Sequence, residues 1–154
     1  MLGSEATTTN FATFDTRNNH PTLVFDSVTQ ECTYWTDVMP WDYGAGGVTI
    51  KLHWTTSTTT TGTAGWTAAF ERMDDNVLDL DTTAGGFGSR TTVTALTVLG
   101  TSGVVATSTV NIANGSAMDS TLAGELFRLE VCRDVANDNT GGDVELLSVD
   151  MKEQ

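Results

Sequence analysis

The sequence predicts an all-β fold, an eight-stranded antiparallel jelly-roll β-sandwich with an extended N-terminal arm. Apolar-rich runs of strand length alternate with clusters of Gly, Asp and Asn along most of the 154 residues. Thr is the commonest residue, and branching at its Cβ suits a pleated strand. No segment shows a helical period long enough to organise a fold. Eight strands with regular turn signals favour two packed sheets, for which the jelly roll is the favoured topology.

The alternation of apolar and polar side chains gives the strand positions. In the third run, Leu52 and Trp54 alternate with polar residues, as a half-buried strand requires. Jelly-roll order places the first, eighth, third and sixth strands in one sheet, and the second, seventh, fourth and fifth in the other. Segments 74–80 and 118–124 each suit one or two helical turns. The predicted strands are residues 22–26, 32–39, 48–55, 65–73, 91–99, 104–112, 125–133 and 143–151.

The first 21 residues differ from the rest of the chain. They are polar, rich in Thr and Asn and without a period, and their apolar landmarks are Phe11 and Phe14. We therefore divide the chain into an extended arm, residues 1–21, and a sandwich domain, residues 22–154. So few apolar groups do not offset about 1–2 kcal/mol of ordering cost per residue, so the arm is expected to be mobile until it meets a partner.

The charge of the chain narrows the choice of partners. Asp and Glu outnumber Lys and Arg by 20 to 7, for a net charge of −13. A surface of that sign repels phosphate groups, which argues against nucleic acid or an anionic membrane as a direct partner. The first residues lack the basic and apolar regions of a secretory signal, and no apolar run approaches the ~18 residues of a membrane span. We expect a soluble protein made in a cytoplasm.

The two cysteines lie on strands that jelly-roll order makes neighbours. Cys32 begins the second strand and Cys132 ends the seventh, so the two residues are expected to lie near each other. Alternation places Cys132 outward with Arg128 and Glu130, whereas Cys32 shares the parity of Tyr34, which we expect to face inward. A disulfide needs Cβ atoms about 3.5–4.5 Å apart and facing each other. Opposite parities therefore predict two free thiols.

The sequence offers no constellation typical of catalysis or of a cofactor site. A metal needs about three protein ligands, and the chain has only His20 in the arm and His53 on an outward strand position. No Ser elbow or triad can be assembled, so we predict no enzyme, no catalytic residue and no cofactor. Two acidic clusters have enough oxygens for calcium, but turn formation by Asp and Asn explains both, and we predict no metal. The clusters are Asp74, Asp75, Asp79 and Asp81, and Asp134, Asp138, Asn139 and Asp143.

The aromatic residues separate into core and surface candidates. Trp54 and Trp66 share the parity of apolar neighbours and are predicted to be core residues. Trp41 and Tyr43 lie in a short loop after Pro40 that looks exposed. Such a pair could bind a glycan, contact another subunit or cover one end of the sandwich. These alternatives remain open at the level of the sequence.

Several segments between residues 22 and 151 carry a family resemblance. They are residues 23–26, Tyr34-Trp35 with Pro40, residues 43–54, Trp66 with residues 69–72, residues 124–131, Arg133-Asp134, Gly142-Asp143 and residues 145–147. Together these segments resemble small jelly-roll structural proteins of tailed bacteriophage virions, of the capsid decoration, head-fibre or tail-associated type. The resemblance implies a place on the virion surface for a protein made in the host cytoplasm. The arm and the two cysteines lie outside it.

The expected function follows from this resemblance and from the missing catalytic residues. We expect a capsid decoration, or cement, protein that binds the outer shell as a homotrimer, with the major capsid protein or another virion protein as partner. The alternative is a carbohydrate- or receptor-binding module of a head or tail fibre, with a glycan as partner. The expected partner-binding residues are Phe11 and Phe14 in the arm and Trp41 and Tyr43 in the loop. Aromatics buried between subunits favour the first function, and aromatics exposed in a groove favour the second.

Overall fold

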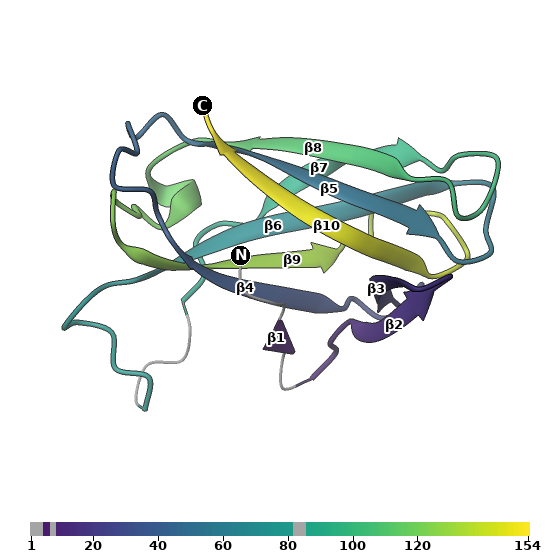
Figure 1. Cartoon of the computed structure of the whole chain (residues 1–154), viewed down its shortest axis with the longest axis horizontal. Coiled ribbons are helices and arrows are strands. Elements are labelled where there is room, and N and C mark those ends of the chain that lie inside the picture. The colour runs from purple at the N-terminus through teal and green to yellow at the C-terminus, as the bar shows by residue number, and fades with distance from the viewer. Residues whose placement is uncertain (1–4, 7–8, 82–85) are drawn as a thin grey trace.

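The protein is a sandwich of two five-stranded antiparallel sheets, seen in a computed structural model that describes residues 5–6, 9–81 and 86–154 (Figure 1). We call them sheet A, with strand order β1-β4-β9-β6-β7, and sheet B, with strand order β2-β3-β10-β5-β8. The strands of sheet A are β1 (Glu5–Ala6), β4 (Cys32–Val38), β9 (Leu126–Arg133), β6 (Thr63–Met73) and β7 (Thr91–Thr97). Those of sheet B are β2 (Thr13–Arg17), β3 (His20–Phe25), β10 (Val144–Glu153), β5 (Val48–Thr56) and β8 (Ala106–Ile112).

The predicted strands and their order are confirmed. The eight strands expected from the sequence are β3 to β10, with ends that shift by a residue or two. Their sheet partners follow jelly-roll order, because β3, β10, β5 and β8 form one sheet and β4, β9, β6 and β7 form the other. The all-β jelly-roll sandwich is therefore the fold of this protein.

The core lies between the two sheets and is built around aromatic side chains. Trp54 and Trp66 are 1% and 0% exposed, which confirms them as core residues. Their ring centroids lie 6.4 Å apart, and Phe25 packs edge-on against Trp66 at 5.1 Å. The indole N–H of Trp54 donates to Ser108 Oγ at 2.9 Å, so the buried polar atom has a partner. The inner faces of both sheets thus meet as the alternation predicted.

The N-terminal segment differs from the mobile arm expected from its composition. Residues 13–17 form β2, which pairs with β3 through a turn at Asn18 and Asn19, both with positive φ. That geometry favours a tight hairpin turn, and Asn tolerates it well. Residues 5–6 pair with β4 on the other sheet. Main-chain hydrogen bonds to its own sheet edges thus supply the order that apolar side chains alone would not.

The prediction of two free thiols is wrong. Cys32 and Cys132 are directly paired residues of β4 and β9, with Cα atoms 4.0 Å apart, and they form a disulfide. The error lies in the parity given to Cys32. It is Trp35 that faces the core, so Tyr34 and Cys32 point outward, on the same side as Cys132. The expected proximity of the two residues is confirmed.

Neither predicted helical segment forms an α-helix. Around residue 118 a 3₁₀ turn spans Ser116–Met118, and Asp119 closes that turn in the left-handed region instead of opening a helix. After β6, the backbone N–H groups of Val77 and Leu78 donate to Asp74 O, which makes a single turn. Among the described residues no helix is long and apolar enough to cross a membrane.

Candidate functional site

The most exposed aromatic side chain of the sandwich is Trp41, in the loop that joins β4 to β5. This loop lies at one end of the sandwich, on the left of Figure 1, beside the loop between β8 and β9. Main-chain hydrogen bonds tie the two loops together, from Met39 N to Glu125 O at 2.8 Å and from Gly124 N to Met39 O at 2.9 Å. The indole therefore stands on a braced pair of loops and not on a free one.

The indole of Trp41 lies against the backbone of Gly124. A Cβ at Gly124 would come within 2.5 Å of the indole Cζ3 and 2.6 Å of Cε3, so no other residue fits beneath the ring. Gly124 also has a φ of +77°, which glycine adopts without strain. With 85% of its surface exposed, Trp41 presents most of its ring system to solvent. The prediction that Trp41 lies outside the core is confirmed.

Tyr43 differs from the exposed loop aromatic that the sequence suggested. Its side chain is buried and turned into the core. Its hydroxyl accepts a hydrogen bond from Gly47 N at 3.1 Å and lies 3.3 Å from Asn114 Oδ1. A Tyr can follow a Trp in a loop and still point inward, because a turn at Pro40 reverses the chain between them. Tyr43 therefore anchors the loop that carries Trp41, and it does not form part of an exposed pair.

Apolar and charged residues lie close in sequence to Trp41 and Gly124 on the two joined segments. Val38 and Leu122 are both about half exposed, and together with Trp41 they form what we call the Trp41 patch. Beside it, Glu125 pairs with Arg72 and accepts a hydrogen bond from Leu122 N at 2.6 Å. Partial burial raises the pKa of Glu125, but these two contacts outweigh it and hold the pKa below its usual value. The patch is thus bordered by a carboxylate that stays charged.

Phe11 and Phe14 lie far from the Trp41 patch. Both are exposed, Phe14 at 69%, and Phe11 forms a bridge to Cys32 at the start of β4. Trp41 follows the other end of β4, and a seven-residue strand spans about 20 Å. The arm aromatics and the loop aromatic therefore belong to two separate surfaces.

The outer face of sheet A holds a cluster of ion pairs that the sequence did not reveal. The Cζ atom of Arg128 lies 4.9 Å from the ring centroid of Tyr34 and 4.8 Å from that of Phe87, and its guanidinium pairs with buried Glu71 at 2.5 Å. Burial, together with the nearby Glu130 carboxylate, raises the pKa of Tyr34. Alternation predicted that Arg128 points outward, but its partners come from strands and loops distant in sequence.

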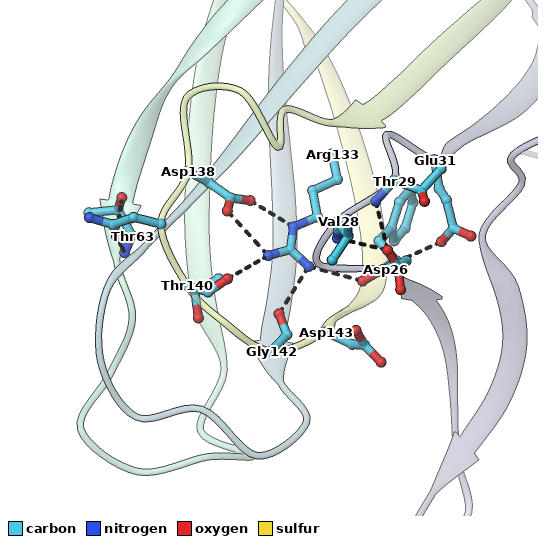
Figure 2. Close-up of polar contacts among 12 residues, drawn as sticks. Asp26, Val28, Thr29, Glu31, Thr63, Arg133, Asp138, Thr140, Gly142 and Asp143 are labelled. Carbon is cyan, nitrogen blue, oxygen red and sulfur yellow. Dashed lines mark hydrogen bonds and ion pairs between the residues drawn. The ribbon is translucent and has the colours of Figure 1, made fainter.

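A second polar cluster is centred on Arg133 and lies near the start of β10 (Figure 2). Arg133 is fully buried, and its guanidinium donates to Asp138 and to the carbonyl oxygens of Phe25, Thr140 and Gly142. These contacts use all five N–H donors of the side chain. The guanidinium thereby fills a cage of oxygens that joins the loop after β9 to the end of β3.

The acidic clusters weighed as calcium sites have protein partners. Asp138 pairs with Arg133 at 2.6 Å, and Asp134 Oδ2 accepts from Asn137 Nδ2 at 2.8 Å. In the other cluster, Asp74 pairs with Arg72 at 3.4 Å. Among the described residues, three potential metal ligands converge at one place, formed by Cys32, Glu130 and Cys132, and there the two sulfur atoms are joined in the disulfide.

The strand order defines the class of this protein as a jelly-roll β-sandwich. No family model matches the chain, and no curated protein matches it. Among solved structures it is similar to CBM35 from Cellvibrio japonicus Abf62, with 12% identity over 98% of this chain and 97% of that one and a TM-score of 0.46. It is also similar to TmCBM61, solved in complex with beta-1,4-galactotriose, with 9% identity over 87% of this chain and 71% of that one and a TM-score of 0.41. Both neighbours are carbohydrate-binding modules.

Proposed function

We propose that this protein is a carbohydrate-binding module that holds a sugar ring on the indole of Trp41. The observation that carries the proposal is the exposed indole itself, 85% accessible and seated on Gly124. A large aromatic side chain left in water forgoes about 1.5–3 kcal/mol of burial, so a braced and exposed Trp suits a ligand-binding role. The C–H groups on one face of a sugar ring pack well on such a surface.

The surroundings of Trp41 supply the polar half of this recognition. Asp42, the residue after Trp41, is exposed, and its carboxylate can accept hydrogen bonds from sugar hydroxyls. Glu125 and Arg72 form a charged pair at the edge of the patch. Hydrogen-bonding groups around an apolar platform are what orient a ligand in a binding site. The buried Tyr43 hydroxyl and the Gly124 contact hold the platform in place before the ligand arrives.

The charge of the protein indicates the class of glycan for this site. The net charge is −13, and two acidic residues, Asp42 and Glu125, directly follow Trp41 and Gly124 in the sequence. A polyanionic glycan would meet repulsion both from the whole molecule and from the site. We therefore propose neutral polysaccharides as ligands of the Trp41 patch.

The test is to measure binding of a panel of neutral polysaccharides and their oligosaccharides, by affinity electrophoresis and by calorimetry. For a ligand that binds, Trp41→Ala should weaken binding at least about tenfold, or ~1.4 kcal/mol. Its melting temperature should stay within about a degree of the parent, because an exposed side chain contributes little to stability. Phe14→Ala is the matched control, since it removes another exposed aromatic ring far from the patch.

Two results would contradict the proposal. One is that no neutral polysaccharide in the panel binds to the parent protein. The other is that Trp41→Ala binds as well as the parent does. Trp54→Ala serves as a contrast, because truncating this buried ring should cost about 3–5 kcal/mol and destabilise the whole sandwich.

A capsid decoration role is the second candidate, and it stays a prediction based on the sequence resemblance. The observation that favours it is the exposure of Phe11 and Phe14 on the N-terminal segment, away from the Trp41 patch. Such side chains can bury against another subunit or a shell. A trimer in solution that co-sediments with emptied capsids is the outcome expected from this role. A monomer that does not co-sediment with emptied capsids would contradict this role.

A further inference from the structure

A groove runs over the outer face of sheet B, beside the first residues of β5 and the last residues of β10. It encloses about 560 Å³, the size of a small-molecule site. It shares no lining residue with the Trp41 patch, whose indole lies on Gly124 in the loop between β8 and β9. Its lining residues are Thr49, Lys51, Asp150, Lys152, Glu153 and Gln154.

This groove holds both lysines of the chain. The five arginines, in contrast, each lie within 4.0 Å of a carboxylate. Neither Lys51 nor Lys152 forms an ion pair with any residue of the described chain, although Asp and Glu outnumber Lys and Arg by 20 to 7. Two cations without an ion-pair partner among the described residues therefore share one hollow with the carboxylates of Asp150 and Glu153.

The strand register brings these two side chains together. Lys51 stands opposite Asp150, and Lys152 stands opposite Thr49, on neighbouring strands and on the same outer face. The two lysines are thus diagonal neighbours, and diagonal Cβ atoms on adjacent antiparallel strands lie about 7–8 Å apart or somewhat less. Flexible four-carbon side chains at that spacing can direct both ammonium groups to one anionic group.

The acidic side chains of the groove are engaged elsewhere. Asp150 Oδ2 lies 2.9 Å from His53 Nε2, although Lys51 is its direct partner across the strands. Glu153 Oε1 accepts a hydrogen bond from Gly44 N. Gln154 Nε2 donates to Val48 O at 2.8 Å. Asp150 and Glu153 therefore contact groups other than the lysines, and neither ammonium group lies within ion-pair distance of a carboxylate of the described residues.

We propose that this groove is a second binding site, for an acidic sugar that carries one anionic group. The ammonium groups of Lys51 and Lys152 bind the anionic group. Thr49 Oγ1, which donates to Asn111 Oδ1, and the Asp150 oxygen that does not contact His53 can each accept a hydrogen bond from a sugar hydroxyl. The lining contains no aromatic side chain, so recognition rests on charge and hydrogen bonds and not on ring stacking. The net charge of −13 disfavours densely charged polyanions, which limits the ligand to an isolated anionic group.

The test compares D-glucuronate with D-glucose, which differ only in the carboxylate at C6. Each is titrated to tens of millimolar into the ¹⁵N-labelled full chain at constant ionic strength, and amide shifts are followed by NMR. We expect glucuronate to move the amides of residues 49–51 and 150–153 in a saturable way, and glucose to leave them in place. Raising the constant ionic strength from about 0.1 to 1 M should weaken the interaction, because exposed charges are screened.

Variants test whether the charges of the two lysines, and not the fold as a whole, are responsible for glucuronate binding. Lys51→Gln with Lys152→Gln keeps side-chain length but removes both charges, and it should abolish the glucuronate shifts while the protein stays folded, with a melting temperature within a few degrees of the parent at the ionic strength of the titration. Lys51→Arg with Lys152→Arg keeps the charge and should retain them. Trp41→Ala should retain them as well, so this site is tested independently of the neutral-glycan site. Equal shifts with glucose, no shifts with glucuronate, or shifts that survive in the double Gln variant would each overturn the proposal.

Discussion

At the scale of single residues, buried charged groups in this protein are stable because each has a named partner. Arg133 is fully buried, and every N–H of its guanidinium meets an oxygen. A charge in such a place would otherwise cost several kcal/mol. Nearby, the carboxylate of Glu31 is partly buried close to two groups of its own charge, Asp26 and Asp143.

Glu31 yields a prediction about pH. Burial raises the pKa of this carboxyl, and the charges of Asp26 and Asp143 add to the effect. The folded protein therefore holds the Glu31 proton more tightly than the unfolded chain, so its charged form destabilises the fold at neutral pH. Glu31→Gln keeps an acceptor for Asp26 N and should raise the melting temperature at pH 7. The gain should shrink as the pH falls towards 4.5, the ordinary value for Glu, where the parent becomes protonated.

Asp26 provides the control of opposite sign. Hydrogen bonds from the backbone N–H groups of Thr29 and Val28 lower the pKa of Asp26. Its charge thus contributes stability that is present above pH 3.8 and is lost below it. Asp26→Asn should lower the melting temperature at pH 7, with a smaller loss near pH 3. Thermal melts from pH 3 to pH 7 measure both variants, and a melting temperature of Glu31→Gln below the parent at pH 7 would refute the prediction.

At the scale of the elements, an ion pair and a disulfide join strands in addition to the main-chain hydrogen bonds of the sheets. β2 forms a hairpin with β3, and Arg17 at its end reaches Glu145 on β10 at 3.1 Å. The disulfide joins β4 and β9 at a separation of 100 residues. Both contacts connect segments that are distant in sequence. The disulfide reduces the freedom of the unfolded chain, and the Arg17–Glu145 pair reduces fraying of β2 at the edge of its sheet.

The disulfide gives the prediction at this scale. In the chain-entropy model, a cross-link that closes about 100 residues stabilises a fold by about 4–5 kcal/mol. For a domain of this size, reduction should lower the melting temperature by roughly 10–15 °C. Cys32→Ser with Cys132→Ser should melt at the reduced temperature and should not respond to the reductant. Two reactive thiols in the denatured but unreduced protein, together with no effect of the reductant, would contradict the pairing.

At the scale of the whole molecule, charge is distributed unevenly. All five arginines form ion pairs within the fold, and Lys51 and Lys152 lie together on the outer face of sheet B. The rest of the surface carries the excess of Asp and Glu behind the net charge of −13. Such an excess repels itself in the compact state and keeps molecules apart in solution.

The corresponding prediction concerns salt. Raising NaCl from about 0.01 to 0.15 M shortens the screening length from about 30 to 8 Å, which weakens long-range repulsion more than the short ion pairs. The melting temperature should therefore rise by a few degrees in scanning calorimetry. The double variant Lys51→Gln with Lys152→Gln removes two more positive charges and should show a larger rise. A melting temperature that falls with salt would mean that the ion pairs outweigh the repulsion.

The sequence by itself determined the strands, their sheet order and the core tryptophans. Alternation with a period of two is a local property, so Leu52 and Trp54 reveal their faces without reference to the rest of the chain. Strand number and turn spacing then left few topologies, and jelly-roll order was among them. The strand positions hold because alternation depends on neighbours in the chain, and the sheet order holds because few topologies suit eight such strands.

The tertiary structure alone decided the features that depend on contacts between distant segments. The disulfide required the parity of β4, which its two buried residues, Thr33 and Trp35, set against the opposite sheet. Tyr43 turned inward, where its hydroxyl donates to Asn114 Oδ1 and accepts from Gly47 N. The free lysines emerged once the register of β5 and β10 was known. Side-chain partners across strands are set by register and packing, and a local pattern does not contain that information.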